Sequence, residues 1–257
     1  MKPIFPVISL SLLWLTCADL DRNNPLDPKN AGSYVDQAIV AELFVNDSTG
    51  YDYCNYALEA IEKISQQAEF NQQLLVLEYH VINKASQHND PYALEACNQR
   101  YYEYVPNTNE RGIPDAMFNG SATRVQGASH EQIELRYTEA ARSLLGKESY
   151  FGIEGSKKLI NNSVQLKFWL ARYSSSWEGE ATLVVVLYED LGIPRYRHVV
   201  RKILPLETIT RMKQGEVLSF TLTEALEQFS YPDNIFAIVM LQRRNHPAKE
   251  IYQVAKL

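Results

Sequence analysis

Basic residues are scarce in this sequence. The chain has 25 lysines and arginines against 31 aspartates and glutamates, a formal net charge of -6. Phosphate backbones are held by a positive field, so this balance disfavours nucleic-acid binding. The apolar run Ile4–Leu15 near the N-terminus is too short to span a bilayer comfortably. The composition, 46% hydrophobic and 22% charged, is that of an ordinary globular protein.

Motifs for metal, nucleotide and dithiol chemistry are also absent. The five histidines show no ligand spacing, and neither H-E-x-x-H nor C-x-x-C occurs. No glycine-rich loop of the phosphate-binding type is present. We therefore expect neither a metal nor a cofactor. We interpret His80 as a packing residue on a strand and His198 as a fold element.

The position of Cys17, the first of three cysteines, predicts that the chain is exported. Lys2 is the one charge before the apolar run, which leads directly into Thr16-Cys17. This is the layout of a bacterial lipoprotein signal peptide, residues 1–17, in which the thiol of Cys17 takes a lipid. Cleavage after Ala18, without a lipid, is the alternative. Residues 18–33 are polar and rich in Asp, Asn and Pro, which is typical of a flexible tether.

Residues 34–150 alternate between strand and helix patterns. Apolar runs bounded by turn residues predict strands, and apolar residues at helical spacing, such as Leu58, Ile61 and Ile64, predict helices. The expected order, β-α-β-α-β-β-α, is that of the thioredoxin-like fold, with an Asn119-Gly120 turn in its hairpin. The expected strands are 38–45, 73–81, 112–120 and 122–127, and the expected helices are 55–70, 91–104 and 129–145.

Residues 160–257 have a different sequence pattern, which predicts short strands at close spacing. Turn residues such as Gly179, Gly192 and Gly215 separate them, which predicts an antiparallel, immunoglobulin-like β-sandwich. We place the boundary between the two domains in the polar region 150–162, and we expect one short helix at 224–229. The fold class is therefore α+β: a thioredoxin-like domain followed by a sandwich. The expected strands are 164–173, 181–189, 198–204, 217–222, 235–242 and 250–254.

Cys54 stands where thioredoxin-like proteins keep a dithiol, between the first strand and the first helix. Exchange needs an attacking thiolate and a second thiol that resolves the mixed disulfide. Alignment from the helix makes Cys54 the second thiol and puts Tyr51 in place of the first. Alignment from Thr49-Gly50 makes Cys54 the first and puts Ala57 in the second place. We favour the first alignment; in both, one partner is missing.

Two further features bear on this site. Ile113-Pro114 precedes a strand at the place where thioredoxin-like proteins carry a cis proline, so we predict that this bond is cis. Cys54 and Cys97 could form a disulfide in an oxidising compartment, or they could be separate thiols. Burial of Cys54 would favour a binding module, and an exposed sulfur would favour an enzyme.

A set of stretches, in this order along the chain, characterises the sequence beyond its single motifs. They are the leader with Cys17 and DRNNPLDP, then TGYDYCNYALEAIEKI, LEYHV, DPYA, GIPDAMFNG, VVVLYED, HVVRKIL and AIVMLQ with KEIYQV. Together they resemble the outer-membrane-protein-28-related family of bacterial envelope lipoproteins, which couple a thioredoxin-like domain to a C-terminal β-sandwich. The resemblance implies an extracytoplasmic location with outer-membrane association, either as a lipoprotein or at the periplasm or surface.

We expect an exported, lipid-anchored envelope protein whose thioredoxin-like domain has lost its dithiol and acts as a binding module. Its partner would be an envelope protein or a peptide, with the membrane reached through the N-terminal lipid. The alternative is a thiol–disulfide oxidoreductase or monothiol protein that uses Cys54 with Pro114. The expected binding residues are Tyr51, Tyr53, Cys54, Ile113 and Pro114.

Overall fold

The computed structural model describes residues 33–47, 52–70, 73–82, 90–127, 129–193, 195–227 and 229–257. The predicted signal peptide with Cys17, nearly all of the predicted tether, and Tyr51 lie outside these residues. The elements in chain order are β1 (Val35–Asp36), β2 (Ile39–Val45), α1 (Asp52–Ser65), η1 (Ala68–Phe70), β3 (Leu74–His80), α2 (Glu95–Tyr104), η2 (Thr108–Glu110), β4 (Asp115–Phe118), β5 (Thr123–Gln126), α3 (Ile133–Arg142), β6 (Glu148–Ser149), β7 (Phe151–Ile160), β8 (Ser163–Arg172), β9 (Trp177–Glu189), β10 (Val199–Met212), β11 (Val217–Ala225), η3 (Pro232–Asn234), β12 (Ile235–Gln242) and β13 (Ile251–Lys256).

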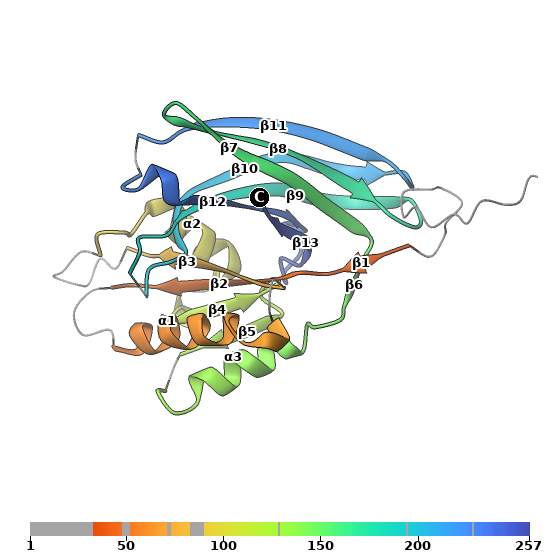
Figure 1. Ribbon diagram of the computed structural model, residues 1–257. Helices are drawn as coiled ribbons and strands as arrows, with labels where there is room; N and C mark the ends of the chain where they lie inside the picture. Colours follow the sequence, from red (N-terminus) through yellow and green to blue (C-terminus); the bar gives the residue numbers. More distant parts are fainter. Residues whose placement is uncertain are drawn as a thin grey trace, which may run out of the picture.

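The fold is α+β and mostly strand. In the described residues, β2, α1, β3, α2, β4, β5 and α3 follow the predicted β-α-β-α-β-β-α order. An eight-stranded sheet has the strand order β13-β12-β9-β10-β3-β2-β4-β5, and a three-stranded sheet has the order β11-β8-β7. Figure 1 shows the three-stranded sheet on one side of the molecule and α1 with α3 on the other.

The eight-stranded sheet continues across both predicted domains. In the following, residues 34–150 are called the N-terminal half and residues 151–257 the C-terminal half. β2 and β3 are parallel, whereas β2, β4 and β5 pair in antiparallel fashion. β10 joins β3 in parallel at Val199 and Glu78, and the Glu78 N–H donates to the carbonyl of His198 at 2.8 Å. The two halves therefore share one sheet.

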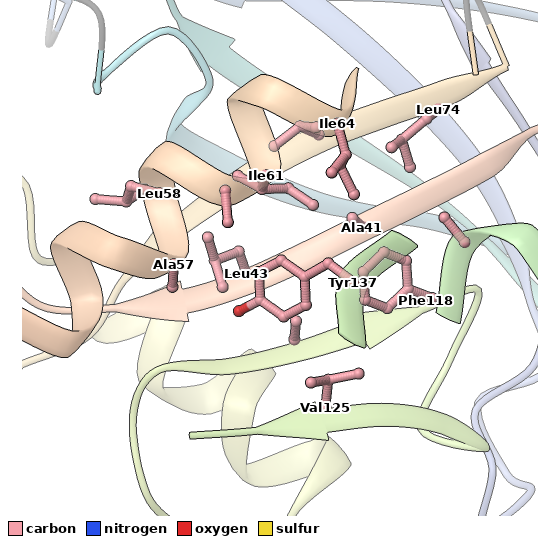
Figure 2. Packing of buried hydrophobic residues seen from close by; sticks show 14 of the residues in the cluster. Ala41, Leu43, Ala57, Leu58, Ile61, Ile64, Leu74, Phe118, Val125 and Tyr137 are labelled. Carbon is pink, nitrogen blue, oxygen red and sulfur yellow. The ribbon is translucent and has the colours of Figure 1, made fainter. Parts of the chain in front are cut away.

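α1 forms because its apolar residues lie along one stripe that the sheet can bury. Leu58, Ile61 and Ile64 are almost fully buried and pack on Leu43 of β2. Figure 2 shows this cluster, in which Tyr137 of α3 lies beside Phe118 of β4. α1 and α3 thus cover one face of β2 and β4.

α2 packs on the opposite face, in a core to which both halves contribute. Cys97 and Tyr101 of α2 pack with Phe44 of β2 and Tyr79 of β3, and the same cluster includes Val186 of β9 from the C-terminal half. Other members from the C-terminal half are Val184, Tyr188, Val200, Ile238, Met240, Ile251 and Val254. The two halves consequently share this core and are not packed separately.

A third core fills the space between the three-stranded sheet and strands β9, β10, β12 and β13. The position of β12 between two cores explains why its sequence is almost continuously apolar. Ala237 and Val239 face this third core, while Ile238 and Met240 face the core around α2. A strand buried on both faces has no polar side to present.

The structure corrects three details of the sequence prediction. Residues 151–160, which the prediction left between the domains, form strand β7 paired with β8. Its first three residues are buried, and the polar residues that follow are largely exposed, which is why they resembled a linker. The expected helix at 224–229 is wrong, because β11 continues to Ala225 opposite Ser163. α2 begins at Glu95 and not at Pro91: the Asp90 carboxylate accepts from the Tyr92 N–H and closes a single turn, but the backbone is extended at Leu94, so that turn does not continue into the helix.

Candidate functional site: a buried thiol and a groove near Ile113

The predicted site residues divide between core, surface and groove. Tyr53 and Cys54 both lie in the first turn of α1, yet Tyr53 is 60% exposed and Cys54 only 1%. Ile113 is half-buried and Pro114 is buried just before β4. The Ile113-Pro114 peptide bond is cis, which confirms the prediction for this bond.

Cys54 is held as a protonated thiol. Burial raises its pKa to about 11, the carboxylates of Asp90 and Asp47 add to the rise, and a hydrogen bond from the Asn46 backbone opposes them. A thiol is a nucleophile only as the thiolate, and this pKa leaves almost none at neutral pH. The helix N-terminus, which would stabilise a thiolate, is outweighed here by the loss of water.

Cys97 does not supply the missing second thiol. It lies on α2, in the core on the other face of the sheet from Cys54, and both cysteines are free. Burial raises the pKa of Cys97 to about 12. The disulfide alternative is therefore wrong for this structure, because α1 and α2 keep the two sulfurs on opposite sides of β2 and β3.

A groove of about 390 Å³ opens next to Ile113 on the α2 side. Ile82, just after β3, and Tyr102 of α2 also line it. Of the other predicted binding residues, Tyr53, Cys54 and Pro114 are not among the residues lining it. The remaining lining residues are Val81, Asn98, Tyr101, Arg111 and Gly112.

Side-chain contacts fix the shape of this groove. The Asn98 amide oxygen accepts from the Ile82 N–H at 2.7 Å, which ties the end of β3 to α2. The Arg111 guanidinium lies 3.8 Å from the centre of the Tyr102 ring, and its Nε donates to the Val105 carbonyl at 2.7 Å. The groove thus has an apolar floor and a fixed cation at one rim.

A buried histidine–carboxylate pair lies behind the groove. His80 Nδ1 is 2.7 Å from the Asp90 carboxylate, which also accepts from the backbone N–H groups of Asp47 and Tyr92. Burial raises the pKa of Asp90, but His80 and these N–H groups outweigh it and hold the pKa below its usual range. Within the described residues His80 Nε2 has no partner, and the imidazole is fully buried. The pair joins the last residue of β3 to Asp90.

Sequence reasoning missed a second buried polar cluster, which joins the two halves. Arg100 of α2 donates to both carboxylate oxygens of Glu42 at 2.9 Å and to the side-chain carbonyl of Gln242 on β12 at 2.6 Å. Tyr104 donates to Glu42 and accepts from Gln242 at 2.8 Å. The one sequence signal was Glu42 itself, an acid inside an apolar strand, because buried charges are retained only when paired.

The topology and the site are those of a mixed α+β protein whose two halves share a sheet, with one buried thiol at a helix start. The sequence matches no family model and no curated protein. The resemblance to the outer-membrane-protein-28-related family therefore stays a proposal.

One solved structure shares this fold over most of the chain. HBP35 of Porphyromonas gingivalis has a TM-score of 0.58 at 11% identity, over 88% of this chain and 76% of that chain. An alkylpurine DNA glycosylase, AlkC, of Pseudomonas fluorescens bound to DNA has a TM-score of 0.30 at 11% identity, over 49% of this chain and 36% of its own. A β-glucosidase from Kluyveromyces marxianus has a TM-score of 0.28 at 11% identity, over 50% and 17%. The TM-scores of the glycosylase and the β-glucosidase are too low to indicate a shared fold.

Within the described ranges, none of the helices has the length and apolar character needed to cross a membrane.

Burial of Cys54 predicts a loss of stability in alkali. The pKa of the thiol is 9.0 in the unfolded chain and about 11 in the folded one, so the folded state is favoured below pH 9 and loses this advantage as pH rises to about 11. The two-unit difference corresponds to about 3 kcal/mol. Urea midpoints of wild type and Cys54→Ala, measured from pH 8 to 11, should converge as pH rises. Parallel pH profiles would contradict the assigned burial of the sulfur.

Proposed function

We propose that this chain is an exported, lipid-anchored protein of the bacterial cell envelope. Its N-terminal half acts as a redox-inactive thioredoxin-like binding module, and its C-terminal half is an immunoglobulin-like sandwich. Support for export comes from the apolar run before Cys17 and the polar stretch that follows it. The observation that carries the binding function is the preformed groove at Ile113, in a chain whose Cys54 thiol is buried and forms no disulfide.

The strand arrangement supports the thioredoxin-like assignment. The order β3-β2-β4-β5, with β2 and β3 parallel and β4 reversed, is accompanied by helices on both faces. A cis Ile113-Pro114 bond precedes β4. We infer that the chain keeps this frame for binding and has lost the thiol chemistry.

A peptide in extended conformation is the occupant that this groove suits. The lining is mainly apolar and aromatic, and its volume of about 390 Å³ accommodates one or two side chains. Arg111 at the rim is held over the Tyr102 ring and by its hydrogen bond to the Val105 carbonyl, and so presents a fixed positive charge. We therefore propose a segment of an envelope protein with an apolar anchor and a neighbouring acidic residue.

Capture of partners from cross-linked envelopes tests this proposal. Cys54→Ser should capture the same partners as wild type, because the thiol does not line the groove. Ile113→Asp and Tyr102→Ala, changes on two different elements of the groove, should each lose them. Leu135→Asp is the matched control, since Leu135 is an apolar residue of α3 that is 58% exposed.

Two further readings complete this test. Wild type should show no thiol-dependent insulin reduction, and turnover that disappears in Cys54→Ser would establish the oxidoreductase alternative instead. The Cys17→Ser variant, which cannot take the lipid, should be found in the soluble fraction instead of the membrane fraction. Retention of all partners by both groove variants would overturn the proposed binding site.

A further inference from the structure

A second cavity lies where the two halves meet, far along the sheet from the groove at Ile113. Its volume is about 310 Å³. It is enclosed by β6 and the start of β7, the end of β8, the start of β9, and β13, and Figure 1 shows β6, β7 and β13 at this junction. Small-ligand sites often lie at such junctions, and this volume suits a compact ligand.

Aromatic rings form one wall of this cavity. Phe151 of β7 stacks on Tyr252 of β13 with ring centres 5.6 Å apart, and Trp177 of β9 meets Phe151 edge-on at 5.3 Å. Trp177 also contacts Tyr252 at 6.0 Å. These contacts hold the rings in place, so a flat apolar ligand would pack against a preformed surface.

Arg172 provides an uncompensated positive charge beside these rings. It is only 6% exposed, and its guanidinium lies 4.5 Å from the centre of the Phe151 ring. Its Nε donates to the Ser175 carbonyl at 2.8 Å and one terminal nitrogen to the Tyr150 carbonyl at 3.3 Å. Among the described residues it has no carboxylate partner, and burial lowers its pKa. A buried charge without a counter-ion is costly, so a site that keeps one is suited to an anion.

The remaining charges of the cavity lie at its mouth. Lys147, Glu148 and Glu250 all line it and are all exposed. Water screens charges at such positions, whereas Arg172 acts in a low-dielectric setting. The electrostatic preference at the base of the cavity is therefore set by Arg172.

We propose that this cavity binds a small anionic ligand that carries an aromatic or similarly flat apolar ring. Its carboxylate or equivalent oxyanion accepts hydrogen bonds from the N–H groups of Arg172 that have no acceptor among the described residues, and its ring packs against Trp177, Phe151 and Tyr252. An arginine fork matches a carboxylate in geometry as well as in charge.

Calorimetric measurement of the affinity of four small probes for the purified full chain tests the proposal. Three probes share the phenylpropyl skeleton and differ in charge, and the fourth has the charge without the ring. The aromatic acid 3-phenylpropionate should bind, and its neutral alcohol, 3-phenylpropan-1-ol, should bind at least about tenfold more weakly, because a charge-assisted bond is lost. Acetate, which has the charge without the ring, should show no binding at the same concentrations. Equal or tighter binding of the cation 3-phenylpropylamine would overturn the proposal, since the acidic rim would then be the site.

Substitutions locate the two parts of this site. Arg172→Met should remove the preference for the acid over the alcohol, whereas Trp177→Leu should weaken both probes alike and keep the preference. Lys147→Met is the matched control, a cation at the rim whose loss should change the acid's affinity less than about twofold. If Lys147→Met abolishes the preference, or Trp177→Leu leaves both affinities unchanged, the assignment is wrong; this decision stands even if Arg172→Met fails to fold.

Discussion

Replacement of Arg100 by methionine is expected to destabilise the folded chain by about 3–5 kcal/mol. The change leaves the Glu42 carboxylate buried without its cation and takes a donor from Gln242. Because Glu42 is fully buried, water cannot replace the lost partner. Urea unfolding, followed by circular dichroism, gives the free energy directly.

The design of this experiment separates pairing from volume. Glu42→Leu combined with Arg100→Met removes both charges and should recover most of the loss, since an apolar pair of similar size needs no counter-charge. Arg142→Met is the matched control: Arg142 makes an exposed ion pair with Glu69, and its loss should leave the midpoint unchanged. An equal effect of both single arginine variants would contradict the role of burial.

The same variant tests whether the two halves unfold together. Trp169 and Trp177 lie on β8 and β9, so their fluorescence reports on the C-terminal half. Arg100 is in the N-terminal half, but its cluster with Gln242 and the shared core should move both transitions together. A shift in the circular dichroism transition without one in tryptophan fluorescence would mean that the halves are independent.

Replacement of Gly120 by alanine is expected to cost about 3 kcal/mol or more. Gly120 has a φ of +108°, and a Cβ there would lie 2.6 Å from the carbonyl oxygen of Ala248 and 2.7 Å from that of Lys249. Both atoms belong to the backbone, so neither can rotate away. Thermal or urea unfolding of Gly120→Ala measures the combined effect of strain and contact.

Gly127→Ala isolates the contact from the backbone strain. Gly127 also has a positive φ, +69°, but nothing lies within 4 Å of the position of a Cβ. It should cost only about 1 kcal/mol, the penalty of the left-handed conformation alone. If the two alanine variants are equally destabilised, the hairpin of the N-terminal half does not press on segment 248–249.

Local sequence patterns predicted the elements well where burial was simple. The stripe of Leu58, Ile61 and Ile64 predicted α1, and the Asn119-Gly120 turn predicted the hairpin, with φ of +49° and +108°. The patterns failed where polarity had another cause. β7 is polar from Glu154 onward because that part is exposed, and Asp90 closes one turn through the Tyr92 N–H without starting a helix.

The candidate site was only partly accessible to sequence reasoning. The cis bond before β4 follows from a local motif, and so does the single cysteine at the helix start. The groove near Ile113 is lined on the other side by α2, which the sequence could not place relative to the loop. Likewise, nothing local indicates that Arg172 lacks a carboxylate partner among the described residues, because that depends on which carboxylates distant strands bring near it.

The sequence by itself determined the order of the main strands and helices from β2 to α3, the absence of a second thiol beside Cys54, and the cis bond at Pro114. Each depends on neighbours within a few positions, where periodicity, turn chemistry and motif spacing operate. Only the tertiary structure decided that the halves share one sheet and one core, that Cys54 and Cys97 lie on opposite faces, and that a buried cation faces an aromatic cavity. These features depend on pairing and packing between residues far apart in the chain, which local patterns do not specify.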